Sequence, residues 1–252
     1  MIKRLIINAD DYGLTEANTI ATIRCHEDGI LTSTTMMVNM PFARYGAELA
    51  KQHPNLGVGI HLVLTMGAPL LPTGKSFTDE NGNFIRPNAG SKEKRDPINL
   101  DELYAEWEAQ IKLFIEIMGK KPTHIDSHHH VHAMTPENLS VTLKLGKKYD
   151  IPVRLIKEVE DYDFEFAKLL PSFYGPNVNC EYFLEGKDNM HDHEVAEVMC
   201  HPSFLDKRLL SISSYTTPRT EEMTVIRCDK IKNWVKDNNI ELINFTDLKK
   251  VK

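Results

Sequence analysis

Five histidines and one aspartate fall within nine residues of the chain, in the run His124-Ile125-Asp126-Ser127-His128-His129-His130-Val131-His132. Neutral imidazole is a common metal ligand, and histidine changes its charge near neutral pH. Along an extended backbone side chains alternate, so every second residue of the run would share one face. That face would carry His124, Asp126, His128, His130 and His132. A solvated polar corner would explain one such histidine, but the whole cluster favours a metal or acid–base site.

Other polar groups follow predicted strands elsewhere in the chain. Asp10 and Asp11 come after the apolar run 5–8, His61 lies late in 56–62, and His201 follows 194–200. In parallel α/β folds, ligands bind outside the carboxyl ends of the strands. Each group alone has a simpler explanation, such as a helix dipole for the aspartates or a core position for His61. Together with His128, they predict one shared site.

This set of residue types suits hydrolysis assisted by a divalent metal ion. A carboxylate and two imidazoles can bind the ion and leave positions open for water. A second carboxylate can then act as the general base, and a histidine opposite it can protonate the leaving group. Asp10 and Asp11 provide one carboxylate for each task, and His201 is the candidate acid.

The elements that must position these residues alternate along the chain. The pattern predicts strands at 5–8, 34–39, 56–62, 121–125, 151–156, 194–200 and 240–244. It predicts helices at 15–26, 42–52 and 100–118, one starting at Thr135-Pro136, and a long one from Thr217-Pro218 through Trp234. Repeated βα units imply a parallel sheet, open or closed into a barrel. Without a linker or a composition break, we expect one domain over residues 1–252.

The helix at 100–118 has the clearest signals, and a long loop precedes it. Asn99 can cap the helix with Glu102 at the capping-box position, and Gly119 can end it. Residues 65–99 are rich in glycine and proline, and Asn81-Gly82 between Phe77 and Phe84 suggests a small hairpin. Loops of this length are often lids or binding loops, so 65–99 is a candidate substrate lid.

The composition indicates a globular protein and argues against several other classes. The chain has 252 residues, 41% hydrophobic and 26% charged, which is ordinary for a globular domain. A formal charge of −6 argues against a nucleic-acid partner. Cys25, Cys180, Cys200 and Cys228 show no CxxC spacing, and Cys200 should point away from His201. The apolar run at the N-terminus is too short for a signal peptide, and no stretch resembles a membrane span. We therefore expect a cytoplasmic protein.

Four segments resemble the YdjC-like carbohydrate deacetylases, with the chitooligosaccharide (chitin disaccharide) deacetylase branch as the nearest match. They are Asn8-Ala9-Asp10-Asp11-Tyr12-Gly13-Leu14, Gly29-Ile30-Leu31-Thr32-Ser33-Thr34-Thr35, Gly59-Ile60-His61-Leu62-Val63-Leu64-Thr65, and 123–132. Met199-Cys200-His201-Pro202 also fits. The histidine motif is highly specific, whereas the Asp-Asp turn alone is not.

The resemblance implies a distorted (β/α) barrel with about seven parallel strands, commonly a homodimer. It implies removal of N-acetyl groups from chitobiose or related oligosaccharides, in some members phosphorylated. Carried onto this sequence, the metal ligands are Asp11, His61 and His128, the base is Asp10, and His201 is the natural acid. Arg154 matches a site arginine, which can steady the base or bind an anionic substituent. A surface salt bridge is the simpler role for Arg154.

Three points stay open on the residues alone. Imidazole ligands favour zinc, nickel or iron, whereas the resemblance implies magnesium. Phe77, Phe84 and Tyr104 are candidates for contact with the sugar. A metal-dependent hydrolase of another bond, such as a phosphoester, is a rival, as is a non-catalytic metal- or sugar-binding protein. The first rival usually has a His-x-His pair where this chain has Asp10-Asp11, and the second needs neither a spare carboxylate nor a late histidine.

Overall fold

The computed structural model describes residues 2–86 and 97–251. One parallel sheet forms its centre, with strands in the order β4-β3-β2-β1-β6-β5 and β7 paired with the start of β1. The strands are β1 (Arg4–Tyr12), β2 (Ser33–Met36), β3 (Gly57–Leu62), β4 (Ile125–Ser127), β5 (Lys168–Leu170), β6 (Val195–Cys200) and β7 (Glu241–Leu242). The sheet curls into an incomplete barrel with seven parallel strands. The predicted α/β fold class is therefore confirmed.

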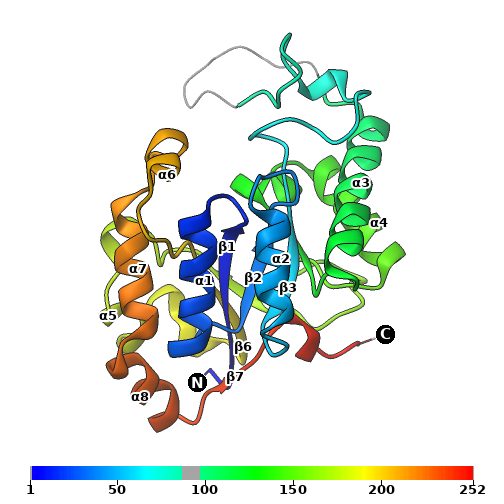
Figure 1. The fold of residues 1–252 in the computed structure, drawn as a ribbon. Helices are drawn as coiled ribbons and strands as arrows, with labels where there is room; N and C mark the ends of the chain where they lie inside the picture. The colour runs from blue at the N-terminus through cyan, green and yellow to red at the C-terminus, as the bar shows by residue number, and fades with distance from the viewer. Residues whose placement is uncertain (1, 87–96, 252) are drawn as a thin grey trace.

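Helices surround this sheet, with α1 and α2 in front, α3 and α4 on one side and α7 and α8 on the other (Figure 1). Their bounds are α1 (Glu16–Asp28), α2 (Ala43–Lys51), α3 (Leu100–Met118), α4 (Pro136–Tyr149), α5 (Glu181–Leu184), α6 (Lys207–Ile212), α7 (Thr217–Arg227) and α8 (Asp229–Asp237). Short 3-10 helices are η1 (Lys75–Phe77), η2 (His128–Ala133), η3 (Gly175–Asn177), η4 (Lys187–Asp192) and η5 (Phe245–Asp247). None of the helices that the structure describes is long and apolar enough to cross a membrane.

The central strand β1 is buried along almost its whole length, because it has paired strands on both sides and helices over its faces. Continuous apolar residues suit such a strand. The polar residues Asn8, Asp10 and Asp11 near its end are nevertheless also buried. Burial of charge requires partners, and those partners form the candidate site.

Helix α3 follows its predicted bounds. The Asn99 side chain accepts hydrogen bonds from the N–H groups of Asp101 and Glu102, and Gly119 ends the helix in the left-handed conformation. Glu102 does not complete a capping box, because its carboxylate accepts the N–H of Ser76 instead, at 2.9 Å. This bond attaches the 65–99 segment to the start of α3.

Three other predicted elements differ from the structure. The strand predicted at 121–125 begins only at Ile125, as β4 (Ile125–Ser127). Residues 151–156 contain no full strand, only an isolated bridge from Val153 to Ile125. The predicted long C-terminal helix is two helices that meet at Cys228, whose extended backbone (φ −73°, ψ 146°) breaks the helical path.

Residues 65–86 rise above the edge toward which β1 points (Figure 1). The predicted hairpin is present, with an antiparallel bridge from Thr78 to Phe84 and Gly82 at φ +76°. Arg86 donates a hydrogen bond to the carbonyl of Ile212 in α6, at 3.1 Å. The lid role stays a prediction, since residues 87–96 lie outside the described residues.

Candidate metal and catalytic site

Three predicted metal ligands meet at the carboxyl edge of the sheet. Asp11 is the last residue but one of β1, His61 lies in β3 and His128 follows β4. Their potential ligand atoms all lie within 4.8 Å of one another. Oδ1 of Asp11 is 2.9 Å from Nδ1 of His128 and 3.4 Å from Nε2 of His61. All three side chains are buried, so this set is an enclosed donor cluster rather than a surface coincidence.

The backbone of Asp11 adopts a conformation that few non-glycine residues take. Its φ is +67°, and the pairing between β1 and β2 shifts register between Ala9 and Tyr12. Such backbone strain is concentrated at functional sites, where it re-aims a side chain. Here the irregularity turns consecutive residues, Asp10 and Asp11, toward different partners.

Arg219 of α7 holds the second oxygen of Asp11. Its Nη2 donates to Oδ2 at 2.7 Å. Burial opposes ionisation of Asp11, but the Arg219 charge and the His128 contact together keep its pKa well below the ordinary value. Asp11 is therefore a carboxylate ready to bind a cation. The sequence reasoning did not identify Arg219, which lies 208 residues from Asp11 along the chain.

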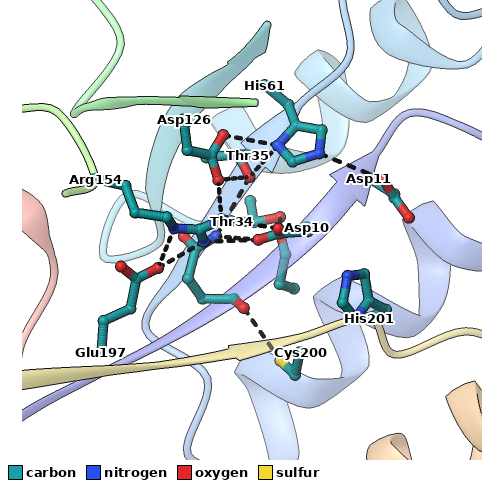
Figure 2. Close-up of polar contacts among 12 residues, drawn as sticks. Asp10, Asp11, Thr34, Thr35, His61, Asp126, Arg154, Glu197, Cys200 and His201 are labelled. Carbon is teal, nitrogen blue, oxygen red and sulfur yellow. Dashed lines mark hydrogen bonds and ion pairs between the residues drawn. The ribbon is translucent and has the colours of Figure 1, made fainter. Parts of the chain in front are cut away.

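Asp126 orients His61. Its Oδ1 lies 2.7 Å from Nδ1 of His61, which leaves Nε2 directed toward Asp11 (Figure 2). Thr35 donates to the other oxygen of Asp126 at 2.9 Å. A carboxylate behind a metal-binding histidine fixes its tautomer and ring orientation. Although burial lowers the pKa of His61, Asp126 and Asp11 raise it to about 10, so a bound cation would have to displace a proton.

The donor set fits a divalent metal ion. It combines one carboxylate with two imidazoles, and Nε2 of His128 is buried without a hydrogen-bond partner among the described residues. A second set of close donors comprises Asp10, His61 and Asp126. Both carboxylates of that set already pair with the Arg154 guanidinium, at 2.7 Å. The Asp11, His61 and His128 set is therefore the better metal site.

Asp10 turns toward Arg154. The guanidinium donates to both Asp10 oxygens, at 2.7 and 2.8 Å, and Figure 2 shows it between Asp10 and Glu197. Arg154 is only 1% exposed, so it is not the surface salt bridge that was the simpler expectation. Burial opposes ionisation of Asp10, but Arg154 lowers its pKa below the ordinary value. Asp10 borders the same cavity as Asp11, as a charged carboxylate in a fixed orientation.

His201 follows β6 at the level of Asp10, because Cys200 and Ala9 are register partners in adjacent strands. The buried carboxylate of Glu222 accepts the backbone N–H of His201 and lies 3.9 Å from its Nδ1. Cys200 points away from His201 and donates through its thiol to the carbonyl of Asn8, as expected for strand neighbours. His201 thus reaches the cavity with a carboxylate behind it.

These groups border a cavity of about 690 Å³. Asp10, Asp11, His61, His128, His201 and Arg219 line one part of it. Tyr174, Tyr215 and Arg86 line the same cavity. Phe77 and Phe84, suggested as sugar contacts, are instead buried against each other with ring centroids 5.8 Å apart. Tyr104 does not line the cavity either and lies beside Lys148.

The histidine run does not keep one face. Strand β4 ends at Ser127, and η2 contains left-handed residues at His129 and His130, so the alternation stops. His124 stacks on Phe245, and His132 contacts Ser127 and the carbonyl of Arg154. Only His128 joins the metal cluster, while His129 and His130 border the cavity.

Comparison with known proteins assigns the chain to a family. Residues 4–237 match the model of the YdjC-like proteins. The chain belongs to the YdjC-like family. Relatives of this YdjC-like chain include carbohydrate deacetylase 2 of Listeria innocua, 37% identical with 98% of this chain and 99% of the relative covered. Another is the chitooligosaccharide deacetylase of Serratia marcescens, 35% identical with 98% and 100% covered.

A solved structure agrees with this assignment. An Enterococcus faecalis protein provisionally named for cellobiose-phosphate cleavage has a TM-score of 0.87 and 34% identity, with 97% of this chain and 98% of that chain covered. A family 4 carbohydrate esterase from Streptomyces lividans shares the fold alone, with a TM-score of 0.53 and 8% identity over 95% and 91% of the two chains. This YdjC-like chain thus has full-length relatives named as carbohydrate deacetylases.

Proposed function

We propose that the protein removes N-acetyl groups, as acetate, from chitobiose or a related chitooligosaccharide with a divalent metal ion as cofactor. One observation carries this proposal. A cation-ready cluster of Asp11, His61 and His128 borders the same cavity as a separate, arginine-held carboxylate, Asp10, and a separate histidine, His201. Metal-assisted amide hydrolysis uses these three components together. The names of the relatives supply the substrate class.

Asp10 is the proposed general base. It would accept a proton from water as the water oxygen bonds to the amide carbon. Arg154 donates hydrogen bonds to both Asp10 oxygens. These bonds hold the carboxylate in one orientation, which proton transfer requires. Because the carboxylate is ionised, it is in the correct state to accept that proton.

His201 is the proposed general acid. It would give a proton to the amide nitrogen as the carbon–nitrogen bond breaks, which leaves acetate and the free amine. The Glu222 carboxylate lies 3.9 Å from its Nδ1. Both proton-transfer groups then come from neighbouring strands, β1 and β6.

The ion held by Asp11, His61 and His128 would polarise the acetyl oxygen and increase the acidity of water. Asp126 and Arg219 would keep two of these ligands in place. Magnesium remains the proposed ion by family resemblance, and the two imidazoles make zinc or another transition metal chemically suitable. The homodimer and the cytoplasmic location also remain predictions.

Acetate release from diacetylchitobiose tests the proposal. Purified protein is stripped with a chelator and reloaded in parallel with magnesium, zinc, nickel, cobalt or manganese. We expect release only in reloaded samples, and elemental analysis of the untreated protein identifies the native ion. A phosphorylated disaccharide in the same assay tests the phosphorylated substrate. Absence of acetate with every ion and both sugars would overturn the proposal.

A phosphoester hydrolase remains the rival activity, and 4-nitrophenyl phosphate tests it in the same reloaded samples. It has less support, because the full-length relatives are named as carbohydrate deacetylases. Metal and sugar binding without any turnover would instead support a non-catalytic binding protein.

A further inference from the structure

Two tyrosines form a flat stack on the wall of the active-site cavity. Tyr174 precedes η3 and Tyr215 precedes α7, yet their ring centroids are 3.9 Å apart with an interplanar angle of 11°. Both rings line the cavity that contains Asp10 and Asp11. The proposed reaction described above gives neither ring a role.

The stack is anchored through Tyr215. Its hydroxyl donates to the buried carboxylate of Glu222 and accepts the N–H of Gly175 at 3.0 Å. The guanidinium of Arg219 lies 5.6 Å from the Tyr215 ring centroid. Because Gly175 directly follows Tyr174, the same hydroxyl also restrains the outer ring. The two rings are therefore held before any ligand arrives.

Tyr174 is the outer member of the stack and is 45% exposed. A large aromatic ring left in contact with water beside a charged, enclosed site is typical of a surface that a ligand covers. The face of an aromatic ring carries partial negative charge, and the C–H groups on one face of a pyranose carry partial positive charge. A pyranose can lie flat on such a ring while its equatorial hydroxyls contact polar groups at the rim.

The position of His201 selects which sugar ring would lie there. Its imidazole meets both tyrosines edge-on, with centroids 5.7 Å from Tyr174 and 5.8 Å from Tyr215. The amide nitrogen that His201 would protonate is bonded directly to a carbon of the sugar ring. A ring resting on Tyr174 therefore places its own nitrogen substituent near His201.

We propose that Tyr174 is a substrate-binding residue that stacks on the pyranose ring bearing the acetamido group to be hydrolysed, with Tyr215 and Glu222 holding it in place. This inference rests on the proposed deacetylase function. It makes the protein select pyranose rings with an unobstructed C–H face. Glu222 also accepts the backbone N–H of His201, so one carboxylate aligns the binding surface with the proposed acid.

Binding and turnover by three variants test the inference. Tyr174→Ala removes the stacking surface, whereas Tyr174→Trp and Tyr174→Phe keep an aromatic face. Tyr45→Ala is the control, because Tyr45 is 40% exposed on α2 and does not line the cavity. Affinity for diacetylchitobiose is measured by calorimetry with metal-loaded protein, KM and kcat by acetate release, and folding by thermal melting.

We expect Tyr174→Ala to weaken binding and raise KM about tenfold, because one aromatic contact contributes binding energy of that size. The change in kcat should be smaller. Tyr174→Phe and Tyr174→Trp should stay within about threefold of wild type, on the same scale. The melting temperature should be unchanged in all of them. Tyr45→Ala should behave as wild type.

The binding series separates this inference from the proposed function. If wild-type protein binds the disaccharide but releases no acetate, the deacetylase function fails, and the affinities alone decide the role of Tyr174. Equal affinity in Tyr174→Ala and wild type overturns the stacking role, as does equal weakening in Tyr174→Phe and Tyr174→Ala. Absence of any binding by wild type also overturns it.

Discussion

His128 and His124 lie four residues apart in one histidine run, yet they occupy opposite environments. His128 faces the carboxylate of Asp11 at 2.9 Å, at the edge of the cavity. His124 lies inside the protein, stacked on Phe245 with ring centroids 3.6 Å apart and an interplanar angle of 7°. His132, at the far end of the run, is also fully buried.

The charge of the neighbours separates these histidines. Burial lowers the pKa of His124 to about 3 and that of His132 to about 4, so both are neutral structural groups. His128 has an ionised carboxylate beside it and a buried Nε2 without a partner in the described part of the chain. The residue types thus indicate that the run could bind a metal, whereas the nearest carboxylate decides which histidine of the run can do so.

His128→Ala should have the largest effect of the substitutions that test this contrast. Mutation of a residue that hydrogen-bonds to a metal ligand typically reduces metal affinity roughly 10- to 100-fold. Removal of one of the three ligands themselves should reduce it further. Acetate release should then fall to background. Metal content after dialysis and acetate release measure the two effects. His132→Ala is the matched control and should keep its metal. If both variants lose metal equally, the contrast between the two histidines is wrong.

Asp10→Asn extends the comparison to another pair of neighbours with different partners. Asp11 faces the imidazoles, and Asp10 faces Arg154. The asparagine should retain the metal but lower kcat about 10²- to 10⁴-fold, because it cannot accept the proton. Elemental analysis and single-turnover acetate release check this result. Full turnover by Asp10→Asn would remove Asp10 from the base role.

His124→Ala should alter stability instead of chemistry. Loss of a fully buried ring stacked on Phe245 should cost about 2–4 kcal/mol in the free energy of unfolding. Metal content should not change, since His124 is outside the donor cluster. Urea denaturation and elemental analysis measure the two properties. A Cβ on Gly59 would lie 2.4 Å from Nδ1 of His124, so Gly59→Ala should also destabilise the protein by displacing this ring.

The sequence predicted the framework of the site because strand ends are strongly marked. Apolar runs placed Asp10, Asp11, His61 and His201 at one edge, and the cap and glycine of α3 fixed its limits. Family resemblance added Arg154 and the separate roles of the aspartates. The alternating face predicted for the histidine run was wrong, because β4 is only three residues long and a left-handed turn follows it.

Three of the groups that sequence reasoning missed come from the region after β6. Arg219, Glu222 and Tyr215 reach the site from α7 and the segment before it, and no local pattern marks them as partners of Asp11 or His201. A salt bridge between residues 208 positions apart depends on how α7 packs. Charged residues on the otherwise apolar buried face of α7 were the available signal, since Arg219 and Glu222 are both buried with Met223 and Ile226.

The last predicted effect is a pH dependence of stability caused by His124. The pKa of His124 is about 3 in the folded protein and near 6.5 when exposed, so unfolding takes up a proton between these values. Its contribution to stability is fully present above pH 6.5 and is lost as the pH falls toward 3. Where unfolding takes up one full proton, the free energy of unfolding falls by about 1.4 kcal/mol for each unit by which the pH falls. Urea unfolding of wild type and His124→Phe between pH 7 and pH 5 measures it. The phenylalanine variant should lose less stability as the pH falls. An identical slope would mean that burial does not lower the pKa of His124, and His124 would then not be a neutral structural group.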